Sequence, residues 1–292
     1  MTTGQTPTRR PVMLVTGAAG QLGCALVTTL ADEYEIVGET RQTLDVTHHA
    51  AVMRRVLEVK PAALINCTAY NDVDGAEADA VTALSVNALA VRTLARAATE
   101  AGAVLVHYST DFVFDGETDR PYTENDRPSP QSIYAQSKLV GEWLAADAPR
   151  HYVLRVASLF GGPQATSSID RIIHALRTGN NPKVFSDRYV SPSFVDDVVS
   201  ATRALLSANA PPGLYHCVNS GYGTWLDVGQ EIARQLGVAD DRLVPVLTSD
   251  VNLKARRPRF AALEATRLGQ QGIVLPRWQA AIRRHVATVL GA

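Results

Sequence analysis

Short apolar runs alternate with helix-patterned segments in the first half of the chain, and this rhythm strongly constrains the fold. The runs VMLVT, AALIN and VLVHY begin at Val12, Ala62 and Val104 and are apolar almost throughout. A strand with a continuous apolar sequence is typically buried on both faces, as in a parallel sheet. Such strands separated by helices form βαβ units with right-handed crossovers. We therefore predict an α/β fold with a doubly wound parallel sheet of the Rossmann type.

The pattern places individual elements along the chain. Strands are expected over 12–16, 35–38, 63–67, 104–109, 152–156 and 213–218, and helices over 22–30, 48–59, 83–101, 132–146, 194–206, 224–236 and from 277 onward. Thr47 is the expected N-cap of the second helix, and Thr224 with Asp227 predicts a capping box. Beyond residue 160 the alternation is less regular. We predict a dinucleotide-binding domain over 11–160 plus 194–220, and a smaller C-terminal substrate-binding lobe over 161–193 plus 221–292.

A glycine-rich turn, GAAGQLG, separates the first strand from the first helix. Gly17 allows a sharp turn, Gly20 lets the backbone approach a pyrophosphate, and Gly23 lets helix and strand pack closely. The helix N-terminus then offers unpaired amides to the phosphates. The spacing is GxxGxxG, and the alternative is a tight turn without a ligand. Because this is the first βα turn of a βαβ series, we favour a dinucleotide site.

The choice of dinucleotide depends on the end of the second strand. A carboxylate there favours a free ribose hydroxyl, whereas an arginine accommodates a 2′-phosphate. The chain offers both, Glu39 and Arg41, although a solvated surface pair is an alternative for each. We predict NADPH, with Arg41 facing the phosphate and NADH as the second candidate. Asp45 and Val46 follow where they could border the adenine.

Tyr134 and Lys138 are four residues apart on a predicted helix, so they share one face. A phenol has a pKa of about 10. A neighbouring ammonium and an oxidised nicotinamide would favour the phenolate and lower that pKa. Tyr134 could then act as general acid in carbonyl reduction, while Lys138 also holds the nicotinamide ribose. Thr110 ends the fourth strand, where its hydroxyl could bind the carbonyl oxygen. An exposed helix pair and an ST turn are the alternatives.

Composition excludes several classes of protein. Lys plus Arg total 28 and Asp plus Glu total 29, for a net charge of −1, so we expect no nucleic-acid partner. No apolar stretch is long enough to cross a membrane, and the N-terminus lacks the apolar core of a signal peptide. The scattered Cys24, Cys67 and Cys217 fit neither a disulfide framework nor a metal site. We expect a cytoplasmic protein without a metal.

The motifs, taken in order, resemble the dTDP-4-dehydrorhamnose reductase family of extended short-chain dehydrogenase/reductases. The resemblance runs from about residue 12 to 285. It depends on GAAGQLG at 17–23, LDVT at 44–47, INCTAYNDVDGAE at 65–77, STDFVFDG at 109–116, YAQSKLVGE at 134–142, LYH at 214–216 and Arg257-Pro258. The ordered set is far more specific than any one motif.

The resemblance implies reduction of the C4 keto group of a dTDP-linked 4-keto-6-deoxyhexose by NAD(P)H. The implied catalytic residues are Thr110, Tyr134 and Lys138. The implied cofactor contacts are Gly17, Gly20, Gln21, Leu22, Gly23, Arg41, Asp45, Val46, Cys67, Thr68, Ala69, Tyr70, Asn87, Tyr134 and Lys138. Substrate contacts are expected from Thr110, Asp111, Phe112 and Arg257, whose guanidinium could bind a diphosphate. For Arg257, a solvated basic segment is the alternative. A homodimer is compatible with the family.

The chain departs from the family pattern at sugar-facing positions. Phe112 stands where Tyr is usual, Leu159 where an aromatic is common, and Arg188 where Gln is frequent; Ala261 and Glu264 replace Ser and Asp. These differences weaken rhamnose as the product more than they weaken reductase chemistry, and a 4-ketoreductase for another deoxyhexose is an open alternative. Two other hypotheses remain. One is a sugar-nucleotide epimerase of the same superfamily, and the other is a non-catalytic regulatory subunit resembling that of methionine adenosyltransferase.

Overall fold

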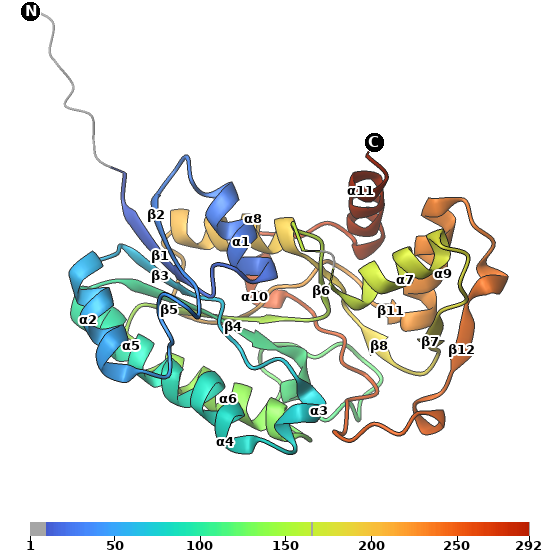
Figure 1. Cartoon of the computed structure of the whole chain (residues 1–292), viewed down its shortest axis with the longest axis horizontal. Helices are drawn as coiled ribbons and strands as arrows, with labels where there is room; N and C mark the ends of the chain where they lie inside the picture. Colours follow the sequence, from blue (N-terminus) through green and yellow to red (C-terminus); the bar gives the residue numbers. More distant parts are fainter. Residues whose placement is uncertain (1–9, 165, 292) are drawn as a thin grey trace, which may run out of the picture.

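Six parallel strands form the central sheet, in the order β10-β5-β4-β3-β1-β2 (Figure 1). The computed structural model describes residues 10–164 and 166–291. The strands are β1 Val12–Thr16, β2 Glu35–Glu39, β3 Ala63–Asn66, β4 Val104–Thr110, β5 His151–Val156 and β10 Gly213–His216. The strand order reverses at β1, which pairs with β2 on one side and β3 on the other. The predicted doubly wound sheet is confirmed, and its ligand crevice is expected beyond the ends of β1 and β3.

Helices cover both faces of this sheet (Figure 1). One face carries α2 His49–Val59, α5 Ala90–Ala101 and α6 Ile133–Ala145, and the other carries α1 Gln21–Thr29, α8 Val195–Ser207 and α10 Thr266–Gln270. Successive strand residues point to opposite faces. Leu14 and Leu64 therefore pack under α2 and α5, whereas Val15 and Ile65 pack under α1 and α8. Burial on both faces explains why these strands have continuous apolar sequences.

A second apolar core lies beside the end of the sheet (Figure 1). It is built from α7 Ser168–Arg177, α9 Trp225–Leu236 and α11 Trp278–Leu290. Three strand pairs flank them: β6 Leu159–Phe160 with β9 Ser193–Phe194, β7 Lys183–Phe185 with β12 Val244–Val246, and β8 Tyr189–Val190 with β11 Gly223–Thr224. Leu268 and Leu275 instead pack in the core of the sheet. They fall inside the predicted lobe range, and the division into two domains stays a prediction.

Two local expectations differ from the structure. Thr47 does not cap α2, because its hydroxyl and amide both donate to the Asp45 carboxylate, at 2.7 and 2.9 Å. His48 takes the N-cap position without a side-chain hydrogen bond. The long helix begins before residue 83, as α4 Ala80–Leu84 followed by a π-helical turn, η1 Ser85–Leu89, that leads into α5.

The Thr224–Asp227 capping box of α9 is confirmed. The Asp227 amide donates to the Thr224 hydroxyl at 3.0 Å, and the Thr224 amide donates to the Asp227 carboxylate at 2.7 Å. Among the helices of the described residues, none is both long and apolar enough to cross a membrane.

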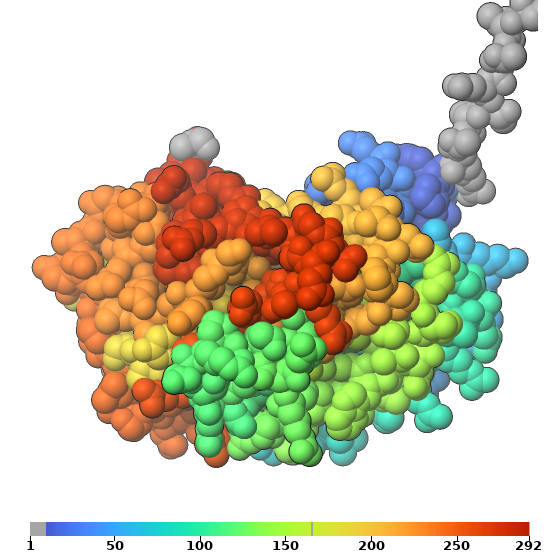
Figure 2. All heavy atoms as spheres, turned by 180° about the vertical axis from the view of Figure 1, so that it is seen from behind, coloured from blue at the N-terminus to red at the C-terminus, as the bar shows by residue number. Residues whose placement is uncertain are grey.

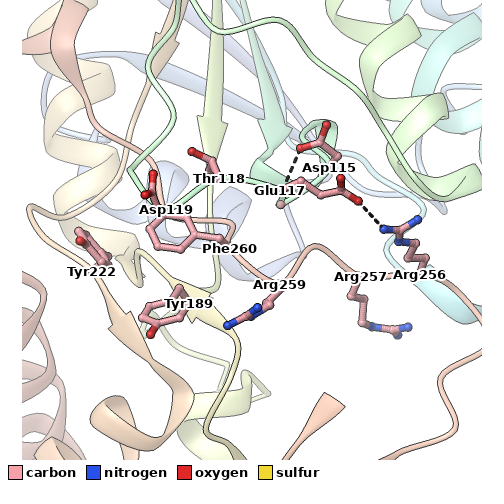
Figure 3. Close-up of a pocket in the computed structure, with 11 residues that line it drawn as sticks. Asp115, Glu117, Thr118, Asp119, Tyr189, Tyr222, Arg256, Arg257, Arg259 and Phe260 are labelled. Carbon is pink, nitrogen blue, oxygen red and sulfur yellow. Dashed lines mark hydrogen bonds and ion pairs between the residues drawn. The ribbon is translucent and has the colours of Figure 1, made fainter. Parts of the chain in front are cut away.

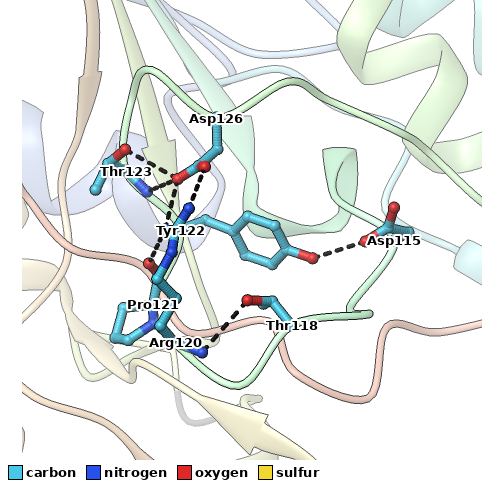
Figure 4. A network of polar contacts seen from close by, with 7 residues as sticks. All are labelled: Asp115, Thr118, Arg120, Pro121, Tyr122, Thr123 and Asp126. Atoms are coloured by element: carbon cyan, nitrogen blue, oxygen red, sulfur yellow. Dashed lines mark hydrogen bonds and ion pairs between the residues drawn. The ribbon is translucent and has the colours of Figure 1, made fainter.

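The loop after β4 is ordered by its own polar contacts (Figure 4). It begins with the short helix η2 Asp111–Val113. The Arg120 guanidinium donates to both carboxylate oxygens of Asp126, and the Tyr122 hydroxyl donates to Asp115 at 2.7 Å. The backbone of Tyr122 also pairs with that of Ala262 and Glu264. Figure 2 shows the green atoms of this loop lying against the red-orange C-terminal segment. The loop therefore joins the end of β4 to residues near 260.

Candidate functional site

The glycine turn lies where the strand order reverses. Gly17 has a φ of +72°, and a Cβ there would lie 2.9 Å from the carbonyl carbon of Cys67, which follows β3. A Cβ on Gly23 would lie 2.2 Å from the Gly17 oxygen. Gly17 thus permits the turn and Gly23 the close packing, as expected from the sequence. The N-cap of α1, Gly20, offers no side chain, so the first amides of the helix remain open to an anion.

A cavity of about 740 Å³ opens beside this turn and extends over the ends of β2 and β3. Its lining includes the predicted cofactor residues Gly17, Gly20, Arg41, Asp45, Val46, Cys67, Thr68, Ala69 and Tyr70. Arg41 is exposed at its edge. Glu39 does not line the cavity, because its buried carboxylate accepts a hydrogen bond from Nε of Arg55 on α2 at 2.6 Å. The arginine therefore faces the cavity and the carboxylate does not.

One buried amide joins the ends of β1 and β3 to the middle of β4. Oδ1 of Asn66 accepts hydrogen bonds from the hydroxyls of Thr16 and Thr68, at 3.0 and 2.5 Å, and from the Thr68 amide. Its Nδ2 donates to Nδ1 of His107 at 3.0 Å. Burial holds the pKa of His107 well below its usual value, so the imidazole is neutral and can accept this bond. This network fixes Thr68 in the cavity wall.

Asn87 does not line the cavity, in contrast to its predicted cofactor contact. It is fully buried in the π-helical turn, and its Oδ1 accepts from the Tyr70 amide at 2.8 Å. Its Nδ2 donates to the Tyr70 carbonyl at 3.1 Å and to the Ser137 hydroxyl at 3.0 Å. Both donor hydrogens of its amide and one acceptor position of Oδ1 are therefore used by protein groups. Asn87 fixes the loop of Tyr70 against the helix α6 that carries Tyr134.

A smaller cavity of about 290 Å³ adjoins the first and shares Gly20, Cys67, Thr68, Ala69 and Asn71 with it. Its lining includes the predicted residues Gln21, Leu22, Gly23, Thr110, Asp111, Tyr134 and Lys138. The last two project from the first turns of α6, whose N-cap Ser132 accepts a hydrogen bond from the Ala135 amide. The structure therefore brings the end of β4, the glycine turn and α6 together around one space.

Burial controls the acid–base properties of this smaller cavity. It raises the pKa of the Tyr134 phenol above its usual value, an effect that Asp111 reinforces and the Thr110 side chain opposes. It also lowers the pKa of Lys138 to about 8, despite the opposing charge of Glu142. The Lys138 ammonium donates to the Tyr108 carbonyl at 2.6 Å. In the protein alone, desolvation of the phenol therefore dominates the Tyr134 pKa, and the expected lowering of that pKa by Lys138 and an oxidised nicotinamide stays a prediction.

The two predicted substrate residues next to Thr110 have different surroundings. Asp111 is buried in the cavity wall, where its Oδ1 accepts from the Thr110 hydroxyl at 3.0 Å. Burial raises the pKa of Asp111 to about 7, although Thr110 and Arg188 favour the ionised form. Phe112 does not line the cavity and packs edge-on against the Tyr134 ring, with centroids 6.1 Å apart. It contributes to holding the phenol in place.

A third cavity of about 880 Å³ lies beyond the loop after β4 (Figure 3). The rings of Tyr189, Tyr222 and Phe260 pack together along one side, with centroids 5.0 to 6.3 Å apart. Arg257 lines this cavity, but both of its terminal nitrogens donate to the Asp74 carboxylate at 2.8 Å. This fork lowers the pKa of Asp74 to about 2.

Two further arginines, Arg256 and Arg259, line this cavity. Arg256 pairs with Glu117 at 2.8 Å (Figure 3). Within residues 10–164 and 166–291, the Arg259 guanidinium is left without a hydrogen bond or ion pair. The sequence did not point to Arg259, Tyr189, Tyr222 or Phe260, because they come from separate segments and share no spacing. The only available signal was the basic segment KARRPRF around Arg257.

Comparison with known proteins identifies the family. A family model described as the RmlD substrate binding domain matches residues 11–290. The chain belongs to the RmlD family. One family relative, the dTDP-4-dehydrorhamnose reductase of Streptomyces griseus, is 34% identical and is aligned over 98% of this chain and 96% of its own length.

Two further relatives of this RmlD family chain are informative. A probable dTDP-4,6-dihydroxy-2-methyloxan-3-one 4-ketoreductase of Streptomyces antibioticus is 34% identical over 96% of both chains. The crystal structure of dTDP-4-dehydrorhamnose reductase from Bacillus anthracis, in complex with NADP, superimposes with a TM-score of 0.90. It is 29% identical and covers 96% of this chain and 99% of its own.

Proposed function

We propose that this chain catalyses the NAD(P)H-dependent reduction of the C4 keto group of a dTDP-linked 4-keto-6-deoxyhexose. The observation that carries the proposal is the shared cavity wall, in which Thr110, Tyr134 and Lys138 adjoin the space beside the glycine turn. Relatives named as dTDP-sugar 4-ketoreductases and dTDP-4-dehydrorhamnose reductases, similar over nearly the full chain, support it.

The residues beside the glycine turn fit a nicotinamide dinucleotide. Gly20 and the open amides of α1 can hold the pyrophosphate. Arg41 faces the cavity and can pair with a 2′-phosphate, whereas Glu39 is bound to Arg55 and is not available to a ribose hydroxyl. The proposed cofactor is therefore NADPH, with NADH as the weaker alternative. When bound, the cofactor supplies the hydride.

The protein's own contribution is the handling of the proton and of the carbonyl oxygen. Because burial raises its pKa, Tyr134 stays protonated near neutrality, as a general acid requires. In the proposed complex the Thr110 hydroxyl turns from Oδ1 of Asp111 to the carbonyl oxygen, donates to it and stabilises the negative charge that develops there. Lys138 places a buried positive charge beside the same cavity, and this charge favours proton release from the phenol. Asn87 positions α6 and thereby Tyr134.

The nucleotide part of the substrate is proposed to lie in the third cavity. The cluster of Tyr189, Tyr222 and Phe260 offers flat apolar surface for a base. Arg259 offers an unpaired guanidinium for a diphosphate. Gly116 lines this cavity only five residues after Asp111, a distance of at most about 17 Å along an extended chain. Arg257 orders the cavity wall through Asp74 and does not itself take the phosphate.

NADPH oxidation with a panel of dTDP-4-keto-6-deoxyhexoses tests the proposal. We expect turnover of at least one member, with loss of NADPH absorbance matched by a product reduced at C4 by NMR. Tyr134→Phe should be inactive under the same conditions. No turnover of any member would contradict the proposal. An enzyme that instead interconverts sugar epimers while retaining NAD would favour an epimerase.

We also propose that the chain forms a homodimer and resides in the cytoplasm. Val81 and Leu84 on α4 and Trp143 on α6 expose apolar side chains, and such exposed apolar residues support the proposal of a homodimer. Light scattering on the purified protein measures the assembly directly. Cys24, Cys67 and Cys217 are free thiols, which supports a location in the reducing cytoplasm. Fractionation of the producing cell tests that location.

A further inference from the structure

A buried ion pair lies between α6 and the sheet, one helical turn after Lys138. The Glu142 carboxylate accepts two hydrogen bonds from Arg155 on β5, at 2.8 Å from Nε and 2.7 Å from a terminal nitrogen. The Ser109 hydroxyl on β4 donates to the same carboxylate at 2.6 Å. All three residues are more than nine-tenths buried. One carboxylate on α6 is therefore bound to two strands of the sheet.

The register of the sheet brings the two donors together. Ser109 and Arg155 are paired neighbours on β4 and β5, and both side chains point to the face that α6 covers. The Arg155 guanidinium also lies against the Phe114 ring, with its carbon 4.9 Å from the ring centroid. Glu142 thus lies over a cross-strand pair whose arginine is itself fixed by packing.

A second contact joins α6 to the preceding residue of β4. The Lys138 ammonium donates to the Tyr108 carbonyl at 2.6 Å. Lys138 and Glu142 are four residues apart, so they share one face of the helix. Their partners, Tyr108 and Ser109, are consecutive in β4, and Thr110 follows directly. These two contacts therefore fix α6 relative to the strand end that carries Thr110.

Stability alone gives little reason for the ion pair. Removing two charges from water is costly, and replacing a buried pair by apolar residues often leaves stability unchanged or higher. A bidentate pair does fix the distance and angle between its partners, because both hydrogen bonds must keep their geometry. Glu142 also brings a negative charge near Lys138 and raises the pKa of this ammonium against the effect of burial. Position and charge both affect the residues of the smaller cavity.

Other titratable groups face the Lys138 ammonium as well. They are Cys67 after β3, His107 on β4, and Asp111 and Tyr134 in the wall of the smaller cavity. Burial raises the pKa of the thiol and of the phenol and lowers that of His107, so these three groups are neutral near pH 7. Glu142 is the carboxylate whose charge raises the pKa of Lys138.

We propose that Glu142 is a positioning residue for the reduction. Through Ser109 and Arg155 it fixes α6 at the distance from the end of β4 that proton transfer requires. Its carboxylate is also the counter-charge of the Lys138 ammonium. Glu142 acts through these residues and not by contact with the substrate. This inference rests on the proposed function.

Ser109→Ala tests the positional role, because it removes one contact and leaves the ion pair intact. We expect kcat at pH 7 to fall about fivefold or more, the rate equivalent of one hydrogen bond. The KM values for NADPH and for the sugar nucleotide should stay within about twofold of the wild type. Tyr152→Phe is the matched control, because it removes a buried hydroxyl from β5 that donates to the Ala210 carbonyl at 2.8 Å. A normal kcat in Ser109→Ala, or a rise in KM alone, would overturn the inference.

Glu142→Gln tests the charge. Without the carboxylate the Lys138 pKa should drop, so the alkaline fall of kcat/KM should move from about 8 to lower pH, by about half a unit or more. Ser109→Ala keeps the carboxylate and should keep the wild-type profile. A Glu142→Gln profile that falls at the wild-type pH would overturn the inference. If the unpaired Arg155 prevents folding, Glu142→Gln/Arg155→Gln removes both charges and should shift the profile in the same direction.

A measurement without turnover separates this inference from the proposed function. NMR titration of ¹³C-labelled lysine side chains gives the Lys138 pKa directly, and Lys138→Arg assigns the signal. This pKa should be lower in Glu142→Gln than in the wild type, and equal values in the two proteins would overturn the inference. A wild-type enzyme that reduces no sugar nucleotide, yet shows the expected difference in the titration, would contradict only the proposed function.

Discussion

Glu39 and Arg55 form a pair at the end of β2, with Arg55 Nε 2.6 Å from a Glu39 carboxylate oxygen. The carboxylate is almost fully buried, whereas Arg55 remains partly exposed on α2. Charge-assisted hydrogen bonds of this length are among the stronger polar contacts in proteins. The pair turns the acidic side chain away from the cofactor cavity and leaves Arg41 at its edge. This arrangement is the structural basis for the proposed preference for NADPH.

Arg41→Ala should therefore reduce the preference for NADPH. We expect the KM for NADPH to rise about tenfold or more, because one charge-assisted contact with the 2′-phosphate is lost. The KM for NADH should change little. Steady-state kinetics with both cofactors measure this, with Arg54→Ala as the control. An equal rise for both cofactors would assign Arg41 a role unrelated to the phosphate.

Tyr134→Phe should lower kcat by about 10²- to 10⁴-fold, the usual contribution of a positioned general acid. NADPH binding, followed by fluorescence, should stay within about twofold of the wild type, since the phenyl ring still packs against Phe112. Tyr34→Phe, on the opposite side of the sheet from α6, is the control. A variant with normal turnover would exclude the phenol as the proton source.

The activity of the enzyme should fall as pH rises through about 8. The pKa of Lys138 is lowered to about 8 by burial, so its ammonium is charged below that pH and neutral above it. The raised pKa of Tyr134 keeps the phenol protonated over the same range. In Lys138→Arg the side chain stays charged above pH 8, so the fall in activity near this pH should disappear. The variant should have a lower rate overall. The same inflection in Lys138→Arg would point to another group.

Stability should depend on the ionisation of Asp111. Its pKa is about 7 in the folded protein and near 3.8 in an unfolded chain, so the folded state binds its proton more tightly. As pH rises from about 4 to 7, the wild type loses stability that Asp111→Asn keeps, by up to a few kcal/mol. Urea unfolding at several pH values should show the variant more stable at pH 8 and the two nearly equal at pH 4. If the difference in unfolding free energy between the variant and the wild type stayed the same from pH 4 to pH 8, the raised pKa of the buried Asp111 would be contradicted.

Arg259→Ala should weaken recognition of the nucleotide. We expect the KM for the sugar nucleotide and the inhibition constant of dTDP to rise about tenfold each, with kcat nearly unchanged. The control is Arg256→Ala in the neighbouring position, whose side chain forms an exposed pair with Glu117. Equal effects of the two variants would indicate a general electrostatic contribution from this segment.

Local patterns predicted those parts of the site that depend on backbone geometry. The spacing of Gly17 and Gly23 indicated the turn, because only a residue without a Cβ fits beside Cys67 and the helix. The spacing of Tyr134 and Lys138 placed both on one helix face. Thr47 was assigned wrongly because Asp45, two residues earlier, competes for its hydroxyl. The preference of threonine for the N-cap position does not reveal this competing hydrogen bond to Asp45.

Properties that depend on tertiary packing could not be predicted from the sequence. The raised pKa of Tyr134 follows from burial, which no helix spacing reports. The cluster of Tyr189, Tyr222 and Phe260 forms only when β8, the loop before β11 and the C-terminal segment meet. Arg188 was visible only as a departure from the family pattern, without its contact with the Phe185 ring.

The most direct test of the central claim follows the hydrogen atoms. NADPH carrying deuterium at the transferable C4 position of the nicotinamide is incubated with the enzyme and a dTDP-4-keto-6-deoxyhexose, and the product is examined by NMR. The account predicts deuterium at C4 of the sugar with the wild type, and no labelled product with Tyr134→Phe on the same time scale. A wild-type product with deuterium at another carbon, or an unlabelled product, would contradict it.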